Sequence, residues 1–211
     1  MPTNCPSEAN VSNNLYCVSA ERHAYLEASE TIDHDHPAVR RRALELSKSA
    51  SRQEETVRNC FEFVRDHIRH SYDFQLNPVT CKASDVLQYQ TGYCYAKSHL
   101  LAALLRANGI PAGLCYQRLT VEGSEAPHCL HGLNAVYLDD YGWYRIDPRG
   151  NKPGVDAQFT PPLESLAFPV THAGERDFFE IYSEPLPCVA EVLTQFNHFQ
   201  DIAENLPDLD L

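Results

Sequence analysis

The sequence is short of basic residues and contains no long apolar run. Lysine and arginine total 17 against 29 aspartate and glutamate residues, which gives a net charge of −12. This charge argues against non-specific binding to nucleic acid or to anionic membranes. No apolar run approaches the roughly 20 residues that a membrane-spanning helix requires. We therefore expect neither a nucleic-acid partner nor a membrane-bound protein.

The N-terminus also lacks the features of a secretory signal, since its first eight residues, MPTNCPSE, include neither a basic region nor an apolar one. The eight cysteines are scattered, without paired spacing and without a Cys-x-x-Cys motif. Several of them fall inside predicted helices or strands. This distribution is typical of a reduced protein rather than of a disulfide framework, so we expect a cytoplasmic location.

The length and composition allow one sizeable domain. The chain has 211 residues, of which 43% are hydrophobic, and it shows no internal repeat or low-complexity tract. We expect a single domain with three parts. These are an irregular N-terminal extension over residues 1–36, a core over 37–150, and a proline-rich segment with a C-terminal helix over 151–211.

The hydrophobic periodicity changes from helical to alternating within the core. Helices are expected over 20–30, 38–49, 51–69 and 83–87, and from Cys94 to the cap at Asn108-Gly109; 70–78 should be an extended loop. Strands are expected over 112–121, 128–138 and 143–147. Residues 151–187 should be loop with a short strand near 178–182, followed by a helix over 189–206. The expected fold class is α+β, with a helical first half packed on an antiparallel sheet.

Cys94 stands at the start of the most apolar of these helices. Unpaired backbone N–H groups and the positive end of the helix dipole favour a thiolate at this position. A free cysteine is nevertheless often a small buried apolar residue without a chemical role. Cys94 is therefore a candidate nucleophile whose case depends on the residues near it.

Two residues of the predicted sheet could complete such a site. A hairpin turn centred on 140–141 places His131 opposite residue 150, near the strand end that carries Asp147. A bulge of one or two residues would bring the imidazole and the carboxylate side by side. The helix that begins at Cys94 would pack across this sheet. The three residues would then form a Cys–His–Asp arrangement through the fold, although each alone more often has an ordinary structural role.

The predicted arrangement assigns a role to each residue. The Cys94 thiolate would attack a carbonyl, and His131 would accept the thiol proton and return it to the departing amine. Asp147 would fix the imidazole tautomer. The backbone N–H of Cys94 is one donor to the oxyanion, and the second could come from a nearby side chain. The candidates are Gln88, which precedes the cysteine by the six residues found in papain-like proteases, and then Gln90 and Tyr93.

Three segments in register resemble the transglutaminase-like superfamily. Residues 83–112 resemble its nucleophile region, 131–138 its histidine strand and 142–148 its aspartate strand. The resemblance covers about residues 55–150. One departure is Leu133, because the family usually has tryptophan two positions after the histidine, and this affects the pocket beside the histidine.

This resemblance implies a papain-like, transglutaminase-core fold. Residues 37–150 would be the catalytic core, and Cys94, His131 and Asp147 would be its catalytic triad. It implies acyl transfer from amide bonds through a thioester, without a cofactor, on a peptide or protein substrate. Water as acceptor gives hydrolysis by a protease or amidase, and an amine gives transglutamination. Further candidates for the substrate cleft are Tyr95, Leu133 and Trp143.

Two other functions remain open from the sequence. The first is a zinc site, because His34-x-His36 and His128-Cys129-x-His131 contain ligand residues. The two clusters lie in unrelated elements, and His128 should point away from the other two, so we expect no metal site. No carboxylate loop has the spacing of a calcium site either. The second alternative is a non-catalytic binding module on the same fold. The sequence gives no indication of the oligomeric state.

Overall fold

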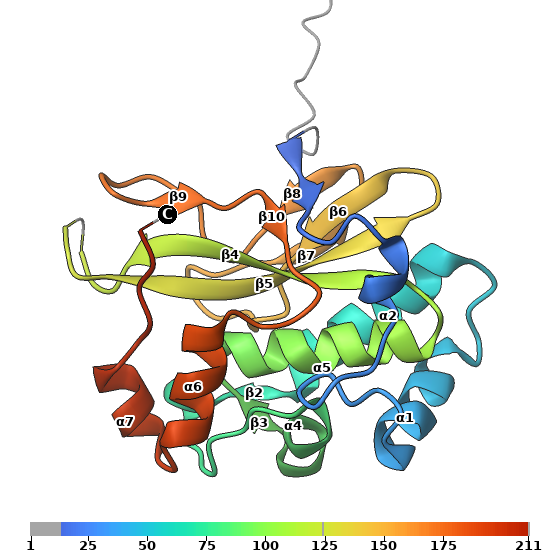
Figure 1. Ribbon diagram of the computed structural model, residues 1–211, viewed down its shortest axis with the longest axis horizontal. Coiled ribbons are helices and arrows are strands. Elements are labelled where there is room, and N and C mark those ends of the chain that lie inside the picture. Colours follow the sequence, from blue (N-terminus) through green and yellow to red (C-terminus); the bar gives the residue numbers. More distant parts are fainter. Residues whose placement is uncertain (1–13, 124, 211) are drawn as a thin grey trace, which may run out of the picture.

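The computed structural model describes residues 14–123 and 125–210 and confirms the α+β class (Figure 1). A layer of helices covers one face of a curled antiparallel sheet, as expected from the change of periodicity. The sheet has the strand order β6-β5-β4-β9. Its strands are β4 (Ala112–Thr120), β5 (His128–Leu138), β6 (Gly142–Ile146) and β9 (Arg176–Asp177).

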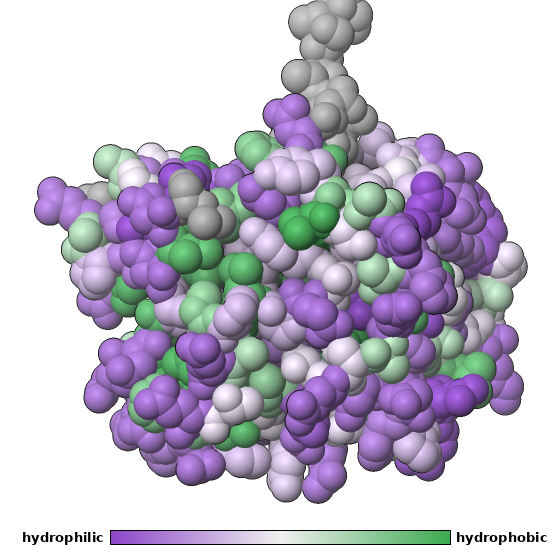
Figure 2. Space-filling model, in the orientation of Figure 1, coloured by the Kyte–Doolittle hydropathy of each residue, from purple (hydrophilic) through white to green (hydrophobic). Residues whose placement is uncertain are grey.

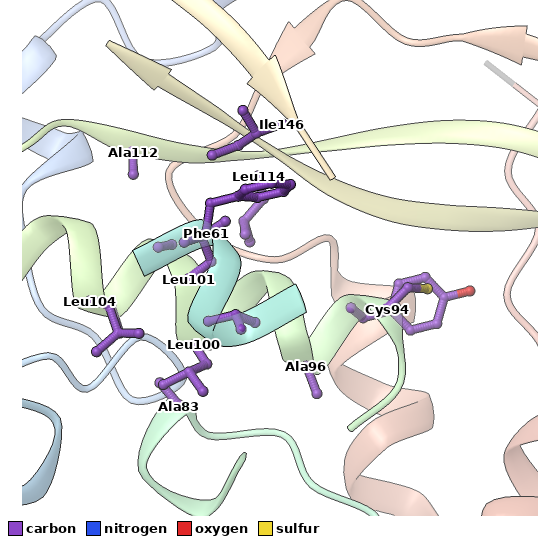
Figure 3. Close-up of a cluster of buried hydrophobic side chains, with 14 of the residues drawn as sticks. Phe61, Ala83, Cys94, Ala96, Leu100, Leu101, Leu104, Ala112, Leu114 and Ile146 are labelled. Carbon is purple, nitrogen blue, oxygen red and sulfur yellow. The ribbon is translucent and has the colours of Figure 1, made fainter. Parts of the chain in front are cut away.

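Helix α5 (Cys94–Ala107) lies between the sheet and the other helices. All its residues from Cys94 to Arg106 are buried, and Leu100, Leu101 and Leu104 are completely so (Figure 3). Burying each such leucine contributes roughly 1.5–3 kcal/mol, so this helix is the centre of the core. The helices packed around it are α1 (Pro37–Ser47), α2 (Gln53–His67) and α4 (Ala83–Tyr89).

The C-terminal end of α5 follows the predicted cap. Gly109 has a φ of +72°, and the N–H groups of Gly109 and Ile110 donate to Arg106 and Leu105. A left-handed glycine after the last turn satisfies carbonyl groups that would otherwise lack partners. The chain then turns back along the helix as β4.

The hairpin between β5 and β6 has a simple one-to-one register. Leu138 pairs with Gly142 and Asn134 with Ile146, without a bulge. This register is one residue away from the expected one, and the predicted bulge is absent. β6 ends where Asp147 and Pro148 follow, since proline cannot donate to a sheet. The edge of β5 before Asn134 is therefore not covered by β6.

Residues 151–187 contain more secondary structure than expected. They contribute β7 (Gln158–Thr160), β8 (Leu163–Ser165), β9 and β10 (Glu180–Ile181). These strands are two or three residues long, which is too short to show a period in the sequence. Arg145 of β6 anchors this segment, because its guanidinium contacts Glu164 and Asp177 at 2.7 Å each.

The loop expected over 70–78 also begins with regular structure. His70 is the second residue of β2 (Arg69–His70), and the next four residues form the short helix α3 (Ser71–Phe74). β2 pairs in parallel with β3 (Thr91–Gly92), directly before α5. This pairing joins two segments about 20 residues apart, which local patterns cannot reveal.

The two ends of the chain differ from their predictions. The helix expected over 189–206 is split into α6 (Pro187–Gln195) and α7 (Phe199–Glu204), where Phe199 N–H donates to Asn77 Oδ1. The helix expected over 20–30 is only the 3₁₀ turn η2 (Arg22–Tyr25). Before it, β1 (Tyr16–Cys17) pairs with β10. Residues 1–13 of the predicted irregular extension lie outside the described residues.

Among the helices of the described segments, none has both the length and the apolar character needed to cross a membrane.

Candidate active site

Cys94 is the first residue of α5, where the edge of β5 meets the helix. The sulfur accepts a hydrogen bond from Gly132 N–H at 3.5 Å. A Cβ atom at Gly132 would lie 2.9 Å from Tyr95 Cδ1 and 3.1 Å from Tyr95 Cα. Only glycine therefore allows β5 to approach the first turn of α5 this closely.

His131 and Asp147 are hydrogen-bonded to each other beside this sulfur. The ring Nε2 of His131 lies 2.8 Å from Asp147 Oδ2. The Asp147 carboxylate is completely buried and also accepts the backbone N–H groups of Arg149 and Ala167, at 3.1 Å each. These bonds fix the orientation of the carboxylate, and the carboxylate in turn fixes the orientation of the imidazole.

The electrostatics of this pair favour its charged form. Burial alone would lower the pKa of His131, but Asp147 and Cys94 act against burial and raise the pKa to about 10. Burial alone would raise the pKa of Asp147, but His131 and the two backbone donors hold it below its usual value. The imidazole therefore stays protonated at neutral pH, beside an ionised carboxylate.

A cleft of about 570 Å³ opens in front of Cys94 and His131. One wall comes from the end of β4 and from residues 168–175, and another from Ala203 and Leu206 at α7. In Figure 2 the left outline of the molecule is indented between the strand ends and α7. Residues 151–187, expected to be loop with a short strand, thus supply part of the cleft and also the Ala167 N–H that donates to Asp147.

A charged group on the other side of the cleft was not predicted. Asp73 accepts hydrogen bonds from Arg149 Nη1 and Lys152 Nζ, at 2.7 Å each. Burial acts against ionisation of Asp73, but these two cations lower its pKa to about 2. His70 lies next to this group and also lines the cleft. Their common position depends on the pairing of β2 with β3, so no sequence motif indicated it.

The three side chains proposed as oxyanion donors are not available at the sulfur. Gln88 and Gln90 are exposed at the end of α4 and do not line the cleft. The six-residue interval between Gln88 and Cys94 therefore does not place Gln88 in the cleft. Tyr93 lines the cleft, but its hydroxyl donates to Phe199 O at 2.5 Å.

Of the three cleft candidates, only Tyr95 lines the cleft, and its hydroxyl donates to Leu130 O. Leu133 and Trp143 lie elsewhere. Gly132 and Asn134 face α5, so Leu133 between them faces the other side of the sheet. There it packs in a separate apolar cluster against which Trp143 also packs. His131 lies on the same face of β5 as Leu133, but it stands in the part of the strand that does not pair with β6.

The histidines of the zinc alternative have other partners. His34 bonds to Leu26 O at 3.0 Å, and His36 accepts the N–H of Ala38 at the start of α1. His128 bonds to Ala173 O at 3.2 Å. Among the residues placed by the structure, no three histidine, cysteine or acidic side chains are grouped so that they could hold a metal ion.

Comparisons with known proteins agree with this fold. The family model of the transglutaminase-like superfamily matches residues 40–148, more than half of the chain. A comparison with curated proteins gave no match. A crystallised protein of Cytophaga hutchinsonii, described as a candidate cysteine protease, superposes with a TM-score of 0.51 at 18% identity, over 63% of this chain and 43% of that one.

Two other solved structures are similar at lower scores. The periplasmic domain of TgpA from Pseudomonas aeruginosa gives a TM-score of 0.46 at 21% identity, over 60% of this chain and 46% of that one. Red sea bream transglutaminase gives 0.37 at 13% identity, over 59% and 27%. The chain covers less than half the length of each of the three proteins. The match of the family model over residues 40–148 shows that the chain belongs to the transglutaminase-like superfamily.

Proposed function

We propose that this protein is a cysteine-dependent enzyme that cleaves amide bonds of peptides or proteins through a thioester. The observation that carries the proposal is the position of the His131 ring. Its Nε2 atom is hydrogen-bonded to Asp147 Oδ2 at 2.8 Å, and the ring also interacts with the thiol of Cys94. A nucleophile, a base and a group that orients the base are the three parts that such chemistry requires.

In the proposed first step, the Cys94 sulfur attacks the carbonyl carbon of the substrate and forms a C–S bond. The carbonyl π electrons move to the oxygen, which becomes an oxyanion. When they return, the C–N bond breaks, and the amine leaves with the proton that His131 donates. A thioester on Cys94 and a neutral imidazole remain.

In the second step, a water molecule attacks the thioester and gives a proton to His131. The C–S bond breaks, the product leaves as a carboxylic acid, and the cysteine–histidine pair is restored. Asp147 keeps the ring oriented and stabilises its charged form in both steps. An amine in place of water would give a new amide, which is transglutamination.

The cleft supports a peptide as the substrate. The cleft volume of about 570 Å³ is large enough for several side chains. The acidic and basic groups along its walls can bind polar peptide atoms.

The proposal is tested by trapping the thioester on a mixture of peptides. The protein is incubated with the peptides and quenched in acid, and mass spectrometry locates acyl groups on individual cysteines. We expect acylation of Cys94 that disappears in Cys94→Ala. Cys129→Ser is the matched control, because Cys129 lines the same cleft and burial raises the pKa of its thiol to about 12. This variant should still acylate at Cys94.

The acceptor is identified by repeating the incubation with cadaverine. Free carboxylate products indicate hydrolysis, and cadaverine amides indicate transglutamination. If Cys94 is never acylated, and Cys94→Ala and wild type process the peptides equally, the enzyme proposal is wrong. A non-catalytic binding module would then be the better interpretation.

We also propose a cytoplasmic location. Seven cysteines within the described segments carry free thiols. Free thiols are maintained in reducing compartments, where catalytic cysteines stay active. Cell fractionation followed by thiol titration checks this proposal, and recovery of the protein from an oxidising compartment with paired cysteines would contradict it.

A further inference from the structure

His70 is a buried side chain of the cleft whose polar atoms are not accounted for. It is only 7% exposed, and its Nδ1 atom is buried without a hydrogen-bond partner among the described residues. The nearest carboxylate oxygen, Asp73 Oδ2, lies 3.8 Å from Nδ1, which is too far for a hydrogen bond. An enclosed atom cannot reach a substrate, so Nε2 is the ring nitrogen that His70 offers to the cleft, and it has no hydrogen bond to any described residue. A buried imidazole without a partner is costly, which points to a ligand atom as the partner of this side chain.

The fold holds His70 next to the start of α5. β2 pairs with β3 so that His70 lies opposite Gly92, two residues before Cys94. The His70 ring packs edge-on against the ring of Tyr93, with 5.4 Å between the centroids. Lys97, one turn into α5, donates to Ile68 O and so ties the beginning of β2 to the same helix.

His70 is neutral at physiological pH. Burial, together with the nearby charge of Arg149, lowers its pKa well below the usual 6.5. A neutral imidazole has one N–H group and can donate it without carrying a charge. Neutral histidines act in this way on carbonyl oxygens in other enzymes.

The other side chains near Cys94 cannot take this role. The hydroxyls of Tyr93 and Tyr95 already donate to backbone carbonyls of Phe199 and Leu130. The ring of His131 is bonded to Asp147 and serves as the base in the proposed function. Among the polar groups described above around the cleft, His70 is the neutral donor that remains without a partner.

We propose that the ring N–H of His70 donates to the substrate oxyanion, together with the backbone N–H of Cys94. The inference rests on the proposed function, since it assigns the second oxyanion donor of the same site. It takes the place of the three candidates from the sequence, Gln88, Gln90 and Tyr93. Removing one such donor slows acyl transfer by about 10²- to 10³-fold in other enzymes.

Two reagents of similar size separate this role from a structural one. 4-Nitrophenyl acetate acylates Cys94 through an oxyanion, and its rate is followed by release of nitrophenolate. Iodoacetamide alkylates the same sulfur by displacement of iodide, without an oxyanion. His70→Phe keeps the ring packed against Tyr93 but removes the donor. We expect its acylation rate to fall about 10²-fold, with the alkylation rate changed less than about 3-fold.

Two further variants provide the controls. His70→Gln keeps an N–H donor and should recover at least tenfold of the lost acylation rate. His99, which lies on α5, is another buried histidine with an unpartnered ring nitrogen. Unlike His70, it does not line the cleft. His99→Gln should leave the ratio of the two rates at the wild-type value. Cys94→Ala gives the background from the other thiols.

An unchanged ratio of the two rates in His70→Phe would overturn the inference and leave the proposed function intact. If His70→Phe does not fold, as judged by circular dichroism, His70→Leu provides the same comparison. If neither reagent modifies Cys94 of the wild type above the Cys94→Ala background, both the inference and the proposed function are wrong.

Discussion

The N–H group of Gly132 lies 3.5 Å from the sulfur of Cys94, so the strand that carries His131 touches the first residue of α5. This contact needs a residue without a side chain, because a Cβ atom at position 132 would lie 3.1 Å from the backbone of Tyr95. The spacing between sulfur and imidazole therefore depends on a glycine that has no chemical role of its own.

Gly132→Ala should separate β5 from α5. We expect a loss of about 1–3 kcal/mol in the free energy of unfolding, because backbone atoms of Tyr95 must move. The rate of Cys94 alkylation by iodoacetamide should change as well. Gly109→Ala, at the opposite end of α5, is the control. Gly109 has a φ of +72°, and no atom lies within 4 Å of the methyl group that alanine would add. The substitution should cost about 1–2 kcal/mol through backbone strain alone and leave the alkylation rate unchanged. Equal alkylation rates in Gly132→Ala and wild type would show that Gly132 does not set the position of the sulfur.

Asp147→Asn should shift the pH dependence of amide cleavage. The wild-type kcat/KM should fall only as the pH approaches 10, where His131 loses the proton that it gives to the leaving amine. Without the carboxylate, the pKa of His131 should move toward its ordinary value of 6.5. The alkaline limb should then appear at lower pH, and kcat/KM at pH 7 should fall about 10²- to 10⁴-fold.

The measurement is the pH profile of kcat/KM on a peptide found by the trapping experiment. Asp66→Asn is the control, since Asp66 forms a partly exposed ion pair with Arg65 outside the cleft. Its profile should match that of the wild type. An alkaline limb at the same pH in Asp147→Asn and wild type would show that this carboxylate does not control the imidazole.

Lys97 and His131 should have opposite effects on stability as the pH rises. Burial lowers the pKa of Lys97 to about 7, so between pH 7 and 10.5 the unfolded chain binds a proton that the folded protein lacks. This group therefore raises stability with increasing pH. The pKa of His131 is raised to about 10, so between pH 6.5 and 10 the folded protein holds the extra proton. This second group lowers stability with increasing pH.

Urea unfolding at pH 7, 8 and 9 checks these two contributions. Relative to wild type, Lys97→Met should lose about 1 kcal/mol per pH unit, and His131→Gln should gain a similar amount. The comparison with wild type cancels the titration of the other groups. If both differences stay constant over this range, the two pKa shifts are absent from the folded protein.

Arg145→Met should loosen residues 151–187. Arg145 is 3% exposed and contacts Glu164 and Asp177 at 2.7 Å each. Its removal leaves two carboxylates without their cation, which costs about 3–5 kcal/mol for a buried group. The exposed pair of Arg42 and Glu45 is the control, and Arg42→Ala should cost less than about 1 kcal/mol. Thermal unfolding measures both, and equal melting temperatures would contradict the anchoring role.

Local patterns in the sequence were sufficient for the central helix α5 and for the three long strands β4, β5 and β6. The leucines of α5 repeat at helical spacing, and the Asn108-Gly109 cap and Pro111 end the helix by backbone constraints that need no tertiary contact. β4, β5 and β6 alternate over enough residues to show their period. The patterns also singled out Cys94, His131 and Asp147, and the family resemblance implied the same three residues as a triad.

The surroundings of the sulfur could not be predicted in the same way. The interval from Gln88 to Cys94 does not give the direction of the Gln88 side chain, which is exposed and does not line the cleft. The phase of Leu133 on β5 became clear only from the contacts of Gly132 and Asn134 with α5. His70 lies next to Cys94 because two-residue strands pair, and strands of that length leave no periodic signal.

The sequence by itself determined the α+β class, the helix that begins at Cys94 and the order of the residues proposed for the triad. Each depends on periodicity, on capping or on motifs within one segment. The tertiary structure decided which side chains surround the sulfur, how residues 151–187 form a wall of the cleft and where His70 lies. These features depend on pairing and packing between distant segments, and their free energy comes from contacts that no single stretch of the chain contains.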